Sequence, residues 1–172
     1  MEAQTRRENI YNALQESRGP LTGADLAKRF RVSRQVIVQD IALLRAKGEG
    51  ILATPQGYIL TRKLKGDLFT ATLACQHSPE EMEEELSLIV SMGGKVVDVI
   101  VDHPIYGELK GVLMISSLKD VSRFIADVKE TSAAPLSALT QGVHLHTVET
   151  TDQATLEDIK KKLKKSGYLV EE

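Results

Sequence analysis

The feature that most restricts the fold is the order of the apolar segments between residues 69 and 150. Short runs with strand character alternate with longer stretches whose apolar residues recur at helical spacing. The predicted elements are strand 69–76, a helix opened by Ser78 and Pro79, strands 95–102 and 108–116, helix 118–131 and strand 144–150. The order β-α-β-β-α-β is typical of the ferredoxin-like split β-α-β plan, so we expect an α+β domain of the ferredoxin-like type.

The segments around this pattern complete the predicted domain. Residues 132–141 are rich in alanine, proline and serine and indicate a loop. Asp152 is expected to open a helix that reaches Lys165, and residues 167–170 a last short strand. In the split plan the first and fourth strands are antiparallel neighbours. The end of strand 69–76 should therefore lie beside the start of strand 144–150.

Two of the four histidines of the chain, His144 and His146, lie two positions apart on the predicted fourth strand. Side chains at this spacing point to the same face of a strand, whereas Val143 and Leu145 point to the other. His77 follows the first strand, so the predicted pairing places it next to both. Glu85 comes eight residues later in the helix, and spacing alone leaves open whether the helix turns it toward the histidines.

Imidazole nitrogens with a carboxylate form a donor set for one divalent transition-metal ion per chain. Zinc, nickel, iron and cobalt all suit such a site, and the sequence alone does not choose among them. The alternative is that the histidines are structural core residues. In the loop between the second and third strands, His103 and Tyr106 are candidates for binding a small ligand. Equally, His103 can be a solvated side chain beside Pro104, and Tyr106 a core residue.

The first 66 residues have a different pattern, which predicts a winged helix-turn-helix. Helical spacing covers residues 5–17, Thr22 is expected to cap a second helix, and Ser33 a third that runs to Lys47. Two short helices joined by a short turn are typical of the helix-turn-helix. The runs 51–53 and 58–60 flank a turn and predict a β-hairpin, the wing.

The start of the third helix carries polar residues where a recognition helix contacts DNA, namely Ser33, Arg34, Gln35 and, one turn on, Gln39. Arginine can bond guanine through two donors, glutamine can pair with adenine, and a helix start can hold a phosphate. After the wing, Arg62, Lys63 and Lys65 offer further phosphate contacts. The alternative is a small helical bundle that binds protein.

Charge separates the two parts of the chain of 172 residues. Residues 1–66 contain 12 Lys and Arg against 6 Asp and Glu, a net charge of +6, and residues 67–172 contain 10 against 18, a net charge of −8. We therefore expect a DNA-binding domain at 1–66 and a regulatory domain at 67–172.

The single cysteine, Cys75, cannot form a disulfide within the chain. No apolar run approaches the roughly 18–20 residues of a membrane span, and residues 1–7 lack the apolar core of a signal peptide. These features favour a cytoplasmic protein.

Three stretches that follow the winged helix, at residues 75–77, 102–108 and 142–146, give the chain its family resemblance. It resembles the niacin-responsive transcription repressors of Gram-positive bacteria, whose C-terminal ligand domain is the three-histidine (3H) domain. The resemblance implies a repressor of niacin transport or salvage genes with nicotinic acid as co-repressor. It also implies a divalent metal held by the residues that match His77, Glu85, His144 and His146.

Together these features predict a homodimeric repressor that binds palindromic operator DNA and a niacin-related effector. A metal-responsive regulator, in which the ion itself is the effector, is the alternative. A metallohydrolase fused to a DNA-binding domain is a third hypothesis. It is disfavoured because no separate base or nucleophile accompanies the metal ligands, so we do not expect an enzyme.

Overall fold

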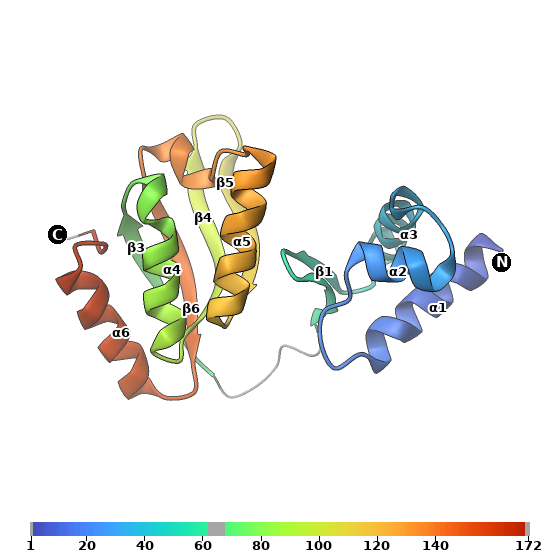
Figure 1. Ribbon diagram of the computed structural model, residues 1–172, viewed down its shortest axis with the longest axis horizontal. Coiled ribbons are helices and arrows are strands. Elements are labelled where there is room, and N and C mark those ends of the chain that lie inside the picture. Colours follow the sequence, from blue (N-terminus) through green and yellow to red (C-terminus); the bar gives the residue numbers. More distant parts are fainter. Residues whose placement is uncertain (1, 62–67, 171–172) are drawn as a thin grey trace. The chain divides into compact units, whose positions relative to one another are not determined.

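The computed structural model describes residues 2–61 and 68–170. The chain divides into two compact units, Met1–Gly66 and Asp67–Glu172, which are described separately (Figure 1). The candidate phosphate-binding residues Arg62, Lys63 and Lys65 lie outside the described residues. None of the helices in the described ranges is both long and apolar enough to cross a bilayer.

The first unit is a winged helix-turn-helix, as the sequence predicted. Its elements are α1 (Ala3–Glu16), α2 (Gly23–Phe30), α3 (Arg34–Ala46), β1 (Ile51–Thr54) and β2 (Gly57–Leu60). Thr22 and Ser33 cap α2 and α3 by accepting the backbone N–H groups of Asp25 and Val36. Between the two helices, Arg31 adopts a left-handed conformation that ends α2 and lets the chain turn.

Strands β1 and β2 form the wing, and β2 is tied to the start of α2. Leu21 and Tyr58 exchange backbone hydrogen bonds of 3.0 and 2.8 Å. Gly57 allows this approach, because a Cβ atom there would lie 2.5 Å from the carbonyl oxygen of Leu21. The wing is thus held against the helix pair. The unit has its own apolar core of Ile10, Leu14, Leu26, Ile37, Ile41, Leu44, Ile51 and Leu60.

The second unit contains a four-stranded antiparallel sheet and three α-helices. Its elements are β3 (Phe69–Gln76), α4 (Met82–Ser91), β4 (Lys95–His103), β5 (Gly107–Ile115), α5 (Leu118–Thr131), β6 (Val143–Thr150) and α6 (Gln153–Lys165). The strand order is β3-β6-β4-β5. The predicted neighbours, the first and fourth strands, are β3 and β6, which pair antiparallel with Cys75 opposite His144. Mixed helix and sheet confirm the α+β class.

The order of the strands differs in one respect from the ferredoxin-like sheet, where the first and third strands are central. Here the central strands are β6 and β4, the fourth and second of the domain. Each β-α-β connection still joins strands separated by one other strand, so the split plan is kept. The consequence for the site is that β6, which carries two histidines, is hydrogen-bonded on both edges.

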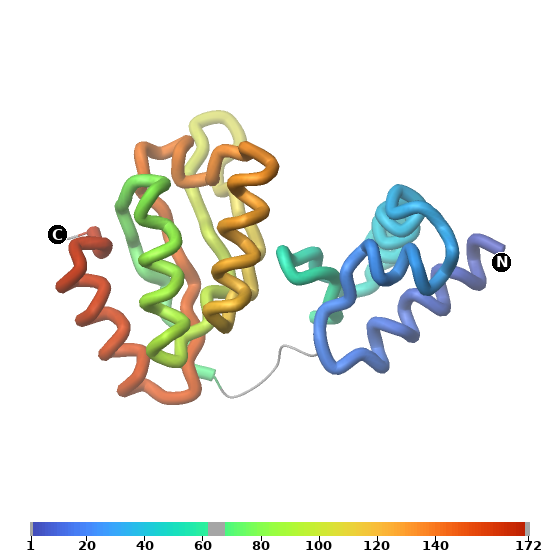
Figure 2. The backbone as a smooth tube through the Cα atoms, in the orientation of Figure 1, coloured from blue at the N-terminus to red at the C-terminus, as the bar shows by residue number. Residues whose placement is uncertain are grey.

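All three helices pack on one face of this sheet, with α4 between α5 and α6 (Figure 1). Apolar residues from the helices and strands form a continuous core, which includes Leu86, Ile89, Val96, Ile125, Val148, Ile159 and Leu163. The tube in Figure 2 shows that β3 ends, and β6 begins, at the same end of the sheet. Residues that follow β3 are therefore brought to the start of β6.

Three local predictions were right only in part or wrong. Ser78 does open the helix with Pro79 in its first turn, but this turn is a 3-10 turn, Pro79–Glu81, before α4 begins. The predicted loop 132–141 contains a 3-10 helix, Leu136–Thr140. Residues 167–170 form no strand; Leu169 makes an isolated bridge with Cys75 at the edge of β3.

Candidate metal centre and DNA-reading surface

Three histidine rings and one carboxylate meet where β3 ends and β6 begins. His77 directly follows β3, His144 and His146 lie on the helix-facing side of β6, and Glu85 points inward from α4. All four are buried; Glu85 is 0 % exposed and none of the others exceeds 8 %. Buried ionisable side chains at this density require strong pairing with one another or with an ion.

All three histidine rings point their Nε2 atom at one carboxylate oxygen of Glu85. The Nε2 atoms of His77, His144 and His146 lie 2.5, 3.4 and 3.3 Å from Oε2 of Glu85. Neighbouring rings meet edge to face, with centroids 4.8 Å apart for His77 and His144 and 4.7 Å for His144 and His146. Glu85, whose position the sequence left open, is thus brought to the centre of the cluster.

The other ring nitrogen of each histidine is held by a backbone carbonyl. Nδ1 lies 2.7 Å from the oxygen of Ser78 in His77, 2.8 Å from that of Gly142 in His144, and 2.7 Å from that of Asp98 in His146. A carbonyl oxygen can only accept, so each Nδ1 must carry the proton and donate it. Nε2 then faces Glu85 in one of two ways: with a second proton it donates to the carboxylate as an imidazolium, and without that proton its lone pair is available to a metal ion.

This donor set fits a divalent transition-metal ion. Nε2 lone pairs and a carboxylate oxygen converge on one point, and the carbonyl partners of Nδ1 are the outer hydrogen bonds that orient metal-bound histidines. Oε1 of Glu85 is buried and, within the part of the chain that the structure describes, has no hydrogen-bond partner. A buried carboxylate oxygen without a partner is costly unless a cation shares the site.

The charges of the cluster are strongly coupled. Burial would raise the pKa of the Glu85 carboxyl, but hydrogen bonds with His144, His146 and His77 outweigh it and hold that pKa well below its usual range. For His77, burial lowers the pKa, whereas the hydrogen bond and negative charge of Glu85 raise it by more. Glu85 therefore stays ionised, and protons and a metal ion would compete for the Nε2 atoms.

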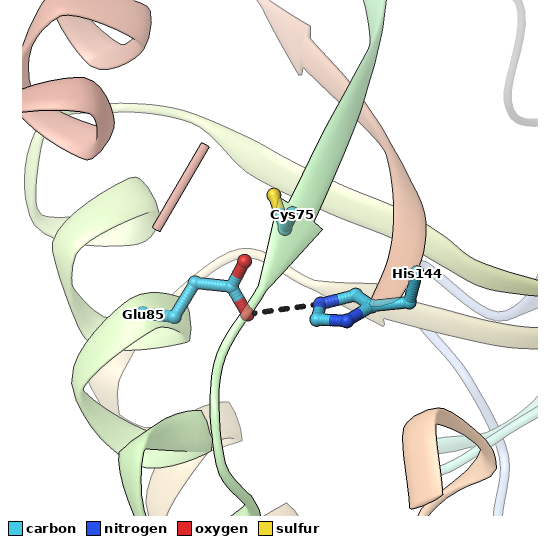
Figure 3. A group of neighbouring side chains, drawn as sticks. All are labelled: Cys75, Glu85 and His144. Carbon is cyan, nitrogen blue, oxygen red and sulfur yellow. Dashed lines mark hydrogen bonds and ion pairs between the residues drawn. The ribbon is translucent and has the colours of Figure 1, made fainter. Parts of the chain in front are cut away.

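Cys75 is a neighbour of this cluster that sequence reasoning missed. Its Sγ, a carboxylate oxygen of Glu85 and a ring nitrogen of His144 all lie within 4.8 Å of one another (Figure 3). Burial, and then the negative charge of Glu85, raise the pKa of the thiol well above its usual range. Register would have revealed this neighbour, because Cys75 pairs with His144.

His103 and Tyr106 are brought together with each other but not with the cluster. They lie at the turn between β4 and β5, their ring centroids are 5.0 Å apart, and Tyr106 is 74 % exposed. Nδ1 of His103 accepts the backbone N–H groups of Ile105 and Tyr106. The described hydrogen bonds thus give His103 the role of shaping the turn.

The candidate DNA-reading residues lie together on α3 and its cap. Ser33, Arg34, Gln35 and Gln39 are all exposed. Arg34 lies at the edge of a pocket of about 250 Å³ that is bounded by the start of α2 and the wing. The same part of the unit therefore presents a guanidinium group, a helix start and the wing to solvent, which are the parts that a winged helix uses on DNA.

Comparisons with known proteins agree with both halves of the chain. An HTH domain model matches residues 6–59 and a 3H domain model matches residues 70–172. The probable transcription repressor NiaR of Thermotoga maritima is 47 % identical over 169 residues, 98 % of this chain and 95 % of the relative. The transcription repressor NadR of Bacillus subtilis is 45 % identical over 169 residues, 97 % and 94 % of the two chains.

An N-terminal helix-turn-helix joined to a second folded domain defines a DNA-binding regulator of transcription. The chain belongs to the family of transcription repressors of the NiaR and NadR type, which join an HTH domain to a 3H domain. This confirms the family that the sequence resembled. Its role is that of a DNA-binding regulator and not of an enzyme, as the sequence predicted.

Proposed function

We propose that this protein is a cytoplasmic, ligand-dependent repressor that binds operator DNA through its winged helix and senses nicotinic acid through its 3H domain. In this function it controls genes for niacin uptake or salvage. The observation that carries the proposal is the convergence of three Nε2 atoms on Glu85, in the domain that follows the helix-turn-helix in the chain. A buried polar cluster of this kind is costly to stability, which favours a role in binding.

In this proposal His77, Glu85, His144 and His146 hold one divalent ion, with nickel or zinc preferred and iron or cobalt also suited. A bound ion would supply a Lewis acid that can take a pyridine nitrogen or a carboxylate from a small ligand. The residues of the chain supply the fixed tautomers and the negative charge that balances the ion. His103 and Tyr106, on the turn between β4 and β5, are proposed as further ligand contacts.

On DNA, Ser33, Arg34, Gln35 and Gln39 are proposed to contact the major groove. A homodimer would place two recognition helices about one DNA turn, roughly 34–36 Å, apart on a palindromic site. The effector acts by binding more tightly to the dimer conformation that fits this spacing than to the one that does not. A ligand shifts an equilibrium between two conformations only by the difference in its affinity for them. The basic charge of residues 1–66 supports this assignment.

The test is a fluorescence anisotropy titration of full-length, metal-loaded protein with an operator selected from random DNA. We expect nicotinic acid to tighten operator binding and nicotinamide, which lacks the carboxylate, to do so less. An operator affinity that is the same with and without nicotinic acid would overturn the co-repressor role. His103→Ala and Tyr106→Phe should weaken the response to nicotinic acid without changing affinity in its absence.

The alternative function is a metal-responsive regulator in which the ion is the effector. It is favoured by the completeness of the donor set, which requires no organic ligand to bring its members together. Chelated protein separates the two functions. If added zinc or nickel restores operator binding with no nicotinic acid present, the ion is the signal; if both are needed, the ion is part of the effector site.

A further inference from the structure

A β-bulge interrupts the central strand β4 directly beside the cluster. The register of β4 shifts between Val96 and Asp98 against both of its neighbours, β5 and β6. Asp98 directly follows this shift and is 4 % exposed, although aspartate is unfavourable in strands and seldom fully buried. Bulges are enriched beside functional sites, where they redirect a group that a regular ladder would hold.

The atoms of Asp98 exchange roles in the ladder. Its Oδ1 accepts the backbone N–H of Thr147 at 3.0 Å, which is the bond that a backbone carbonyl makes in a regular strand. Its own carbonyl oxygen is thereby free to accept Nδ1–H of His146 at 2.7 Å. The second carboxylate oxygen, Oδ2, lies 3.5 Å from Nζ of Lys110 on β5. The carboxylate of Asp98 thus takes the place of the backbone carbonyl in the ladder, and the carbonyl of Asp98 holds the ring of His146.

His146 needs this arrangement, whereas the other two histidines do not. His77 and His144 bond carbonyls one and two residues away in the chain, those of Ser78 and Gly142, which lie at the ends of strands and outside the sheet ladders. His146 lies inside β6, between two paired strands. The carbonyls near it belong to the ladders, so its Nδ1 requires an acceptor from a neighbouring strand, and Asp98 supplies it.

We propose that Asp98 is a positioning residue of the metal centre, whose carboxylate maintains the bulge that fixes the tautomer and direction of His146. This inference rests on the proposed metal site. Asp98 does not bind the ion itself; it acts through its carbonyl on His146. Loss of such an outer partner typically lowers metal affinity about 10–100-fold.

The test compares Asp98→Ala with Asp98→Asn in the full-length protein. Affinity for Zn²⁺ and for Ni²⁺ is measured by competition with a chromophoric chelator. We expect about a 10–100-fold loss in Asp98→Ala. Asp98→Asn keeps an acceptor for the N–H of Thr147 and should retain affinity within a few-fold. Lys110→Gln removes only the ion pair, and we expect it to bind metal like the wild type.

A merely structural role predicts a different result. In that case Asp98→Ala would lower the free energy of unfolding of the chelated protein, but the folded variant would bind metal as tightly as the wild type. That result would overturn the positioning role of Asp98 and leave the proposed metal site standing. Wild-type protein that binds neither ion would overturn the proposed metal site itself, so the two failures are distinguishable.

A second measurement does not depend on whether Asp98→Ala folds. Long-range ¹H–¹⁵N spectra of the histidine rings in chelated wild type should show His146 protonated at Nδ1, and Asp98→Asn should keep that tautomer. A neutral His146 protonated at Nε2 in the wild type would overturn the inference, because the carbonyl of Asp98 would then have no proton to accept.

Discussion

At the scale of single residues, the centre depends on how each histidine is prevented from turning. A free imidazole can present either nitrogen, but here three backbone carbonyls take the three Nδ1 protons. The Nε2 atoms then have one target, Oε2 of Glu85. Tautomer selection is therefore built into the backbone around the cluster. The carboxylate balances the charge that an ion would bring into a buried site.

Metal should stabilise the folded protein through these residues. An ion that binds the native state at a concentration about 100 times its Kd adds about 2.7 kcal/mol to the free energy of unfolding. We expect chelation to lower Tm and added zinc or nickel to restore it, measured by differential scanning calorimetry. His146→Ala should abolish the response. His103→Ala, which changes a histidine outside the cluster, should keep it; loss of the response there would contradict the assignment.

The thiol of Cys75 should be unreactive in the native protein. The side chain is 0 % exposed, and burial together with the charge of Glu85 raises its pKa, so little thiolate is available. We expect a disulfide reagent such as Ellman's to react slowly with native protein and fast after unfolding in guanidinium chloride. The reaction is followed by the absorbance of the released thiolate. Fast reaction of the folded protein would contradict the prediction and show that the structure around Cys75 opens readily.

At the scale of elements, the end of β3 and the start of β6 have to approach closely for the cluster to form. Gly142, which precedes β6, has φ +90°, and a Cβ atom there would overlap the carbonyl oxygen of His77. Gly142 therefore meets two requirements of this position: the backbone is left-handed, and it lies against the backbone of His77 at the end of β3. The contact holds His77 and His144 in reach of each other.

Gly142→Ala should therefore damage the site and not only the turn. The left-handed backbone costs a non-glycine residue about 1–3 kcal/mol, and separation of the strand ends adds to this. Gly107→Ala is the matched control, because Gly107 has φ +70° but open space around it. We expect both to lower the free energy of unfolding in urea, and only Gly142→Ala to weaken zinc binding. Equal zinc affinity in the two variants would contradict this role.

The recognition element, α3 with its cap, makes a separate prediction. If Arg34 bonds a base edge, Arg34→Ala should cost about 1–3 kcal/mol of operator binding and relax specificity at one base pair. If it holds a phosphate beside the start of α2, affinity should fall for all sequences and the dependence on salt should become weaker. Anisotropy titrations at several salt concentrations, with operator and with unrelated DNA, distinguish the two. An unchanged affinity would remove Arg34 from the interface.

At the scale of the molecule, the chain has two separate apolar cores. One is formed by Leu14 and its neighbours in the first unit, and the other by residues such as Leu163 in the second. Basic charge is concentrated in the first unit and acidic charge in the second. Each unit thus has its own core, and the positive net charge of the first unit suits a DNA partner.

Separate cores predict two unfolding transitions, of which metal raises only one. Leu14→Ala should destabilise the first unit by about 2–5 kcal/mol, and Leu163→Ala should do the same for the second. Calorimetry with and without zinc assigns the transitions: the one that zinc shifts should be the one that Leu163→Ala lowers. A single transition that both variants lower together would mean that the units unfold as one.

Much of this architecture could be predicted because the signals are local. Helix caps such as Thr22, Ser33 and Asp152 act within three residues, and strand alternation acts within two. The antiparallel pairing of the first and fourth strands also followed from element order. The caps and the alternation are set by residues close together in the chain, and element order limits which strands can pair. The sequence therefore determined the two units, most of their elements and the approach of His77 to His144 and His146.

Other features were decided only by the tertiary structure, because they depend on packing between distant segments. The angle of α4 on the sheet places Glu85, and no spacing in the chain specifies that angle. The register of β3 and β6 sets Cys75 beside the cluster, and the bulge at Asp98 supplies His146 with its acceptor from 48 positions away. The sequence thus determined which donors come near one another, and packing decided how they are oriented.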